Sequence, residues 1–62
     1  MKLNKINNLI NKAEAERQIA EDRYWHYYKL EMHQTAELWD VRRVEFDKLI
    51  TKLKEAQKHN NY

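Results

Sequence analysis

The fold is decided by the stretch from residue 24 to residue 36, which reads YWHYYKLEMHQTA. On both sides of it, apolar or long-stemmed residues recur at steps of three or four, from Leu3 to Ala56. This is the period of one face of an α-helix, whereas a half-buried strand would alternate. The chain also has no glycine and no proline, which the tight turns of β folds need. The sequence therefore predicts an all-α protein built from long amphipathic helices.

The helical pattern changes its phase inside this stretch. A seven-residue repeat runs in one frame before it and in a frame offset by one residue after it. Such a shift is compatible with one long coiled-coil helix, or with an antiparallel helical hairpin whose turn lies near residues 28–36. The two frames are Leu3, Ile10, Arg17 and Tyr24, and then Trp25, Met32, Trp39, Phe46 and Leu53.

Turn chemistry leaves both alternatives open. Residues 29–35 contain no Gly or Asn that would end a helix, which counts against the hairpin. In its favour, Thr35 is a suitable N-cap for a second helix, with Glu37 in the first turn of that helix. A hairpin centred near residues 29 and 30 would pair alanines with rings, but it would also place Arg17 opposite Arg42. We expect the hairpin and keep the single helix as the alternative.

The 62 residues form a single domain, 1–62, whose core is expected to be marginal because so short a chain buries little of its surface. We therefore expect a homo-oligomer, with a dimer as the simplest form. Asn11 and Glu14 have the spacing of a capping pair. This spacing predicts that residues 1–10 are frayed or form a separate short helix, and we expect residues 59–62 to be a frayed tail.

The location of the protein is inferred from what the sequence lacks. It has no cysteine for disulfides, its first residues are too polar for a signal peptide, and no apolar run approaches the roughly 20 residues that span a bilayer. We expect a cytoplasmic protein that does not enter membranes, located in the host cytoplasm if a phage encodes it.

The apolar stripe of the second half is the candidate core. Side chains spaced at three, four or seven residues along a helix lie on one face, where they pack within the hairpin or against a second copy. The residues expected in the core or in self-association are Met32, Trp39, Phe46, Leu49 and Leu53.

An aromatic run and a second apolar set are the candidate binding site. Four aromatic rings among residues 24–28 must face several directions on a helix, and Tyr and Trp are enriched at binding hot spots. Core rings, or a four-helix bundle of two hairpins, would also explain these residues. The residues expected to bind a partner are Tyr24, Trp25, Tyr27, Tyr28, Leu30, Val41 and Val44.

Charge is segregated along the chain. Residues 1–12 carry three positive charges, the middle of the chain has a net charge of −4, and residues 48–59 have a net charge of +3. A hairpin would bring both basic ends together, which keeps nucleic-acid binding as an alternative although the net charge is only +2. The residues for such contacts would be Lys2, Lys5, Lys12, Lys48, Lys52, Lys54 and Lys58.

Catalysis and metal binding find little support in the sequence. There is no serine, no cysteine and no glycine-rich phosphate loop, so we expect no enzyme and no cofactor. His26 and His33 each have an acidic residue four positions away, but both fall outside the heptad frames. We interpret them as surface residues and expect no metal.

These observations favour a protein-binding role. The richness in Lys, Asn and Ile is typical of AT-rich coding sequences, including those of phages and plasmids. We expect a small non-enzymatic module, an inhibitor or regulator encoded by a phage or other mobile element, that docks on a larger host protein. The alternatives are a small basic helical dimer that binds nucleic acid and a structural component of a larger assembly such as a virion.

Overall fold

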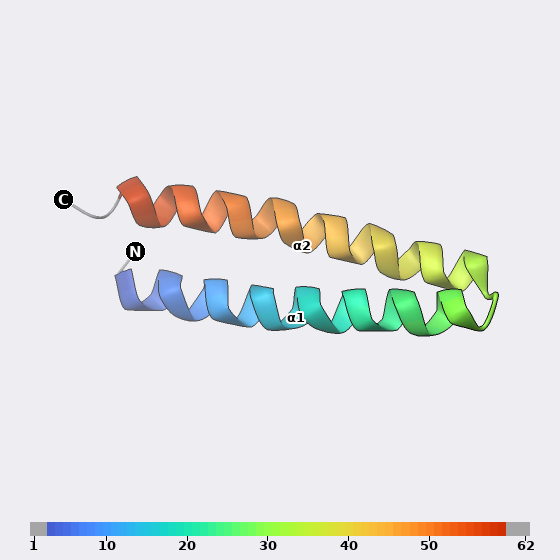
Figure 1. The fold of residues 1–62 in the computed structure, drawn as a ribbon. Coiled ribbons are helices and arrows are strands. Elements are labelled where there is room, and N and C mark those ends of the chain that lie inside the picture. Colours follow the sequence, from blue (N-terminus) through green and yellow to red (C-terminus); the bar gives the residue numbers. More distant parts are fainter. Residues whose placement is uncertain (1–2, 60–62) are drawn as a thin grey trace.

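The computed structural model describes residues 3–59, which form two helices. Helix α1 spans Leu3–Lys29 and helix α2 spans His33–His59. The helices pack side by side and antiparallel in a rod of 49 × 14 × 11 Å (Figure 1). The predicted all-α hairpin is confirmed, and the single long helix is wrong. Within residues 3–59, neither helix is long and apolar enough to cross a membrane.

The turn consists of Leu30, Glu31 and Met32 and lies inside the predicted interval. Glu31 has a φ of 58°, the left-handed conformation that glycine normally supplies at the end of a helix. The Glu31 N–H donates to the Tyr28 carbonyl and the Met32 N–H to the Tyr27 carbonyl, each at 3.0 Å. This pair of bonds is a Schellman motif, so α1 is closed without any Gly or Asn.

Helix α2 begins earlier than its capping residues suggest. The Met32 carbonyl accepts a 2.9 Å hydrogen bond from the Ala36 N–H, which makes Met32 the N-cap residue. Thr35 therefore lies inside the first turn, and Glu37 lies beyond it. The predicted Thr35 cap is wrong because the Schellman motif ends at Met32 and leaves no room for further loop residues.

The N-terminal part of α1 is also more regular than expected. Asn11 and Glu14 lie inside α1 and cap nothing, and residues 3–10 continue the helix without a break. Ile6 and Ile10 are 0% and 6% exposed, and this packing outweighs the weak helix propensity of the asparagines. His59 is the last residue of α2, and the rest of the expected tail, residues 60–62, lies outside the described residues.

The seam between the helices is narrow and rich in alanine. In the predicted α1 frame, Ile10 is buried and Arg17 and Tyr24 are half-buried. In α2, Ala36 is buried, and Ile50 is buried in place of its neighbour Leu49, which was predicted as a core residue. Small side chains let the two backbones approach closely. The buried residues are Ile6, Ile10, Ala13, Ala20, Ala36 and Ile50.

Cross-helix contacts define the register. Asn7 bonds to Gln57 and Arg17 bonds to Asp47, and both pairs are symmetric about residue 32. The predicted centre near residues 29 and 30 is therefore two to three residues too early. Arg17 meets an aspartate in this register, so the expected clash with Arg42 does not occur.

Candidate protein-binding surfaces

Two flanks border the seam, and each consists of rows of residues that recur every seven positions on a helix. The polar flank carries Asn7, Glu14, Glu21 and Tyr28 of α1 with His33, Asp40, Asp47 and Lys54 of α2. The apolar flank carries Leu9, Glu16 and Arg23 of α1 with Trp39, Phe46 and Leu53 of α2.

An aromatic cluster occupies the turn end of the polar flank. The ring centroids of Tyr24, Trp25 and Tyr28 lie 5.0 to 5.8 Å from one another, and the His33 ring lies 5.5 Å from Tyr28. Trp25 and Tyr28 are 50% and 46% exposed, although they are large and partly apolar. Most of these ring contacts are edge-on, an arrangement that stabilises aromatic pairs beyond their burial.

Helix spacing and the turn together create this cluster. Tyr24, Trp25 and Tyr28 lie at positions i, i+1 and i+4 of α1, which share one side of a helix. His33 joins them from the start of α2, because the tight turn brings that residue back beside Tyr28. The cluster therefore depends on the turn as well as on the aromatic run.

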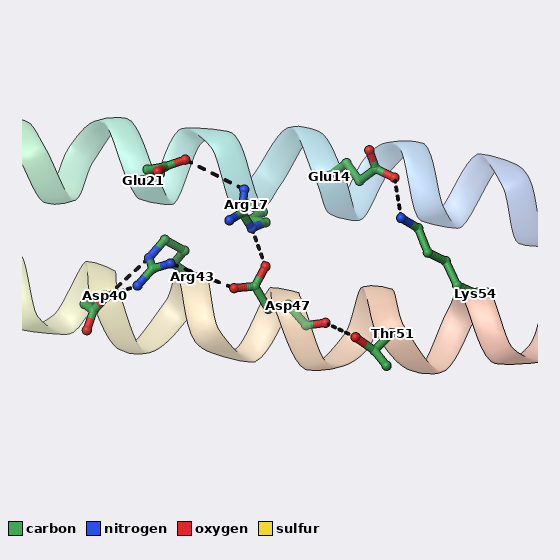
Figure 2. Close-up of polar contacts among 8 residues, drawn as sticks. All are labelled: Glu14, Arg17, Glu21, Asp40, Arg43, Asp47, Thr51 and Lys54. Carbon is green, nitrogen blue, oxygen red and sulfur yellow. Dashed lines mark hydrogen bonds and ion pairs between the residues drawn. The ribbon is translucent and has the colours of Figure 1, made fainter.

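A chain of ion pairs runs along the polar flank (Figure 2). Arg17 bonds to Asp47 across the seam, and its Nη1 lies 3.7 Å from Glu21 Oε2. Arg43 Nη2 donates to Asp40 Oδ1 at 2.6 Å, and its Nη1 lies 3.9 Å from Asp47 Oδ2. Asp47 is thus shared between one arginine from each helix.

Arg43 is fixed in place by its carboxylate neighbours. The hydrogen bond to Asp40 is the main reason why the pKa of Arg43 is raised above its usual value. Arg43 and Asp40 also line a shallow hollow together with Glu21, Tyr24 and Trp25. The exposed rings therefore lie beside oriented charges, and the combination offers a partner both apolar area and hydrogen-bonding groups.

The apolar flank has a different character. Leu9, Phe46, Leu49 and Leu53 surround a groove of about 330 Å³ whose floor includes Ala13. Leu9 and Leu49 are 37% and 44% exposed. Two charged residues, Lys12 and Glu16, also line this groove.

Trp39 lies further along the apolar flank, toward the turn. The guanidinium carbons of Arg23 and Arg42 lie 5.5 and 5.0 Å from the centroid of its ring. Both distances are within the range of a cation–π interaction. Trp39 is therefore half-buried under two arginines, one from each helix.

The residues predicted to bind a partner are divided among several surfaces. Tyr24, Trp25 and Tyr28 form the aromatic cluster, whereas Tyr27 makes an edge-on contact with His26, at 5.1 Å between the ring centroids. The other predicted binding residues are exposed outside the cluster: Leu30 in the turn at 57%, and Val41 and Val44 on α2 at 54% and 38%.

The predicted core residues are also divided. Trp39, Phe46 and Leu53 are half-buried at the seam, whereas Met32 and Leu49 are 45% and 44% exposed. Met32 and Leu49 therefore do not belong to the core of one hairpin, and a role in self-association stays a prediction for both.

The predicted nucleic-acid contacts among residues 3–59 lie in the half of the rod away from the turn, where α1 starts and α2 ends, and Lys48 lies close to the middle of α2 (Figure 1). Lys54 lies 4.0 Å from Glu14, and Lys12 lines the apolar groove. Lys2 lies outside the described residues, and the remaining lysines of this set are exposed: Lys5, Lys48, Lys52 and Lys58.

The two histidines considered as metal ligands contact different rings, His26 that of Tyr27 and His33 that of Tyr28. Among residues 3–59, no group of three or more His, Asp and Glu side chains is arranged to hold a metal ion.

Several contributors to these surfaces were not identified from the sequence. Arg17 was assigned to the apolar seam, and Asp40, Arg43 and Asp47 were not assigned to any site. A usable signal was present, because Asp40 and Asp47 lie seven apart with Arg43 between them. That spacing predicts i,i+3 and i,i+4 ion pairs on one side of a helix.

Comparisons with protein-family models, curated proteins and solved structures find no significant match for this chain.

Proposed function

We propose that this protein is a non-enzymatic protein-binding module, an inhibitor or regulator that docks on a larger protein through the aromatic cluster and the adjoining ion pairs. The observation that carries this proposal is the half exposure of Trp25 and Tyr28 beside oriented charged groups. Large aromatic side chains near fixed hydrogen-bonding groups are the usual energetic centre of protein interfaces. The encoding of the protein by a phage or other mobile element stays a prediction from composition.

The large rings of the aromatic cluster are only partly used for packing in the free hairpin. Trp25 contributes little to the seam, since half of its surface is in contact with solvent. A partner that covers this ring would gain the hydrophobic free energy that the hairpin does not use. The contacts of Trp25 with Tyr24 and Tyr28 already order the side chain, so little conformational entropy would be lost on binding.

The test is a quantitative affinity purification from the source cell, comparing the wild type with Trp25→Ala. We expect the variant to keep its helix content and to lose a specific partner, with binding weakened about 30-fold or more, as for a hot-spot residue. Trp25→Phe should retain part of the binding. Leu38→Ala, which truncates a 67% exposed side chain outside the cluster, is the matched control and should change nothing. A partner that both alanine variants retain equally would contradict the proposal.

Nucleic-acid binding is the second candidate, and the observation that favours it is that the start of α1 and the end of α2, which both carry lysines, lie at the same end of the rod (Figure 1). Binding through several lysines would weaken steeply with salt, because condensed counterions are released from the nucleic acid. A fluorescence titration with duplex DNA at 50 and 200 mM salt distinguishes this candidate. Binding that is unaffected by Lys52→Ala and Lys58→Ala together would exclude it.

A further inference from the structure

The apolar flank remains uncovered in the hairpin. Its groove is bordered by Leu9, Phe46, Leu49 and Leu53, and Ile19, one helical turn beyond Glu16, is 48% exposed. The chain has an accessible surface of 5173 Å², whereas a compact monomer of its mass exposes about 4,300 Å². The excess is close to the roughly 800 Å² that each partner buries in an interface of standard size.

Charged residues that line the groove on α1, or that neighbour Leu49 on α2, are arranged with two-fold symmetry. On α1, Lys12 and Glu16 are one helical turn apart, and their midpoint is residue 14. On α2, Glu45 and Lys52 flank Leu49 at the i−4 and i+3 positions, and their midpoint falls between residues 48 and 49. Each pair contains one base and one acid, so a two-fold axis through its midpoint would bring opposite charges together.

The two midpoints lie at the same level of the rod. Cross-helix pairs that are symmetric about residue 32 place residue 14 opposite residue 50. The α2 midpoint is within two residues of residue 50, and two residues correspond to about 3 Å along a helix. One axis perpendicular to the helices can therefore pass through both midpoints.

We propose that a second copy of this chain covers the apolar flank, antiparallel to the first, and that two hairpins form a four-helix bundle. In this arrangement α1 packs against α1 of the second copy and α2 against α2 of the second copy. Lys12 meets Glu16, Glu45 meets Lys52, and Leu49 lies on the axis beside its own counterpart. Because C2 symmetry is the commonest form of homo-oligomer, a self-complementary flank fits a second copy better than a foreign protein.

The apolar contacts follow from the same axis. Leu9 and Ile19 are also symmetric about residue 14, so each exposed side chain packs on the other across the interface. Phe46 and Leu53 are related in the same way about a point near Leu49. One like-charged contact also results, between Lys5 and Arg23 at roughly 14 Å from the axis, and it opposes part of the gain.

This dimer does not depend on the proposed protein-binding function. The aromatic cluster lies on the polar flank, away from the interface. An antiparallel arrangement places the two turns, and so the two aromatic clusters, at opposite ends of the bundle. Loss of the dimer and loss of partner binding can therefore be observed separately.

The test uses light scattering and sedimentation equilibrium on the purified chain, with changes on the axis. Leu49→Glu places two carboxylates beside each other at the axis, so we expect dimerisation to weaken at least 100-fold, and Leu49→Lys should act in the same way. An equimolar mixture of these two variants should form a heterodimer, because the charges then attract. Val44→Glu, at an exposed position on another side of the same helix, is the control and should leave the dimer intact.

The edge charges give a second, independent readout. Lys12→Glu alone should weaken the dimer about tenfold, because two acids then face each other, and Glu16→Lys alone should do the same. The double variant Lys12→Glu/Glu16→Lys should restore the wild-type affinity, since the opposite charges meet again. A wild-type chain that remains monomeric at millimolar concentration, or a dimer that Leu49→Glu leaves unchanged, would overturn the proposal.

Discussion

The polar and the apolar flank of the hairpin differ in how many of their side chains find partners within one chain. On the polar flank, Arg17 and Arg43 share Asp47, and the ion pairs close within the chain. On the apolar flank, large side chains such as Leu9 and Leu49 stay more than one third exposed. The polar flank therefore holds the hairpin in shape, and the apolar flank leaves hydrophobic free energy for association.

The two flanks also differ in how strictly they determine the register of α1 on α2. Apolar contact is non-directional, so several registers of α1 on α2 would bury similar areas. The register about residues 29 and 30 would set Arg17 against Arg42, whereas the observed register sets it against Asp47. Like charges at a half-buried seam are costly, and the ion pair thus selects one register among several apolar matches.

The largest expected effect on stability comes from truncating a buried residue of the seam, compared with truncating its exposed neighbour. Ile50→Ala removes a side chain that is 8% exposed, and we expect the free energy of unfolding to fall by about 3 kcal/mol. The neighbouring change Leu49→Ala, at 44% exposure, should cost less than about 1 kcal/mol at low protein concentration, where a dimer contributes least. Urea unfolding followed by circular dichroism measures both. A larger loss for Leu49→Ala than for Ile50→Ala would mean that Leu49 is the buried residue, as predicted from the sequence.

The sequence was sufficient for the fold class, the turn interval and the buried face of α1. It was not sufficient to choose Arg43 over Arg42, or Ile50 over Leu49, for the seam of α2, because residues 42 and 43 are both arginine and residues 49 and 50 are both apolar. Periodicity cannot distinguish between neighbours of the same kind. The distinction comes from Asp47, which binds arginines of both helices and turns Arg43 toward the seam.

The candidate site was predictable to a similar extent. The aromatic run was recognised, but the contact between Tyr28 and His33 exists only because the chain reverses at Glu31. Nothing in the residue type of Glu31 predicts a left-handed conformation, since this conformation is unfavourable for residues with a Cβ. The turn forms because packing along both helices outweighs a small local cost.

The next largest effect tests the polar flank. Asp47→Ala leaves Arg17 and Arg43 without their shared carboxylate, and we expect a loss of about 1.5 kcal/mol, since the groups are only partly exposed. The loss should shrink in 1 M salt, because screening weakens ion pairs near the surface. Glu55→Ala, which removes an exposed carboxylate of α2 outside both flanks, is the control for net charge. Equal effects of the two changes on thermal unfolding would show that the shared aspartate contributes only charge.

The smallest effect concerns the turn that joins the two flanks. Glu31 holds a φ of 58°, where a residue with a Cβ is strained and glycine is not. Glu31→Gly should raise the free energy of unfolding by roughly 0.5–1 kcal/mol, because the relief of strain exceeds the extra entropy of glycine in the unfolded chain. Glu31→Ala removes the same charge but keeps the Cβ, so it should give no such gain. The gain should be equal in low and high salt, unlike the effect of Asp47→Ala, because it arises from backbone sterics. A gain that Glu31→Ala reproduces would instead assign the effect to the charge of the turn.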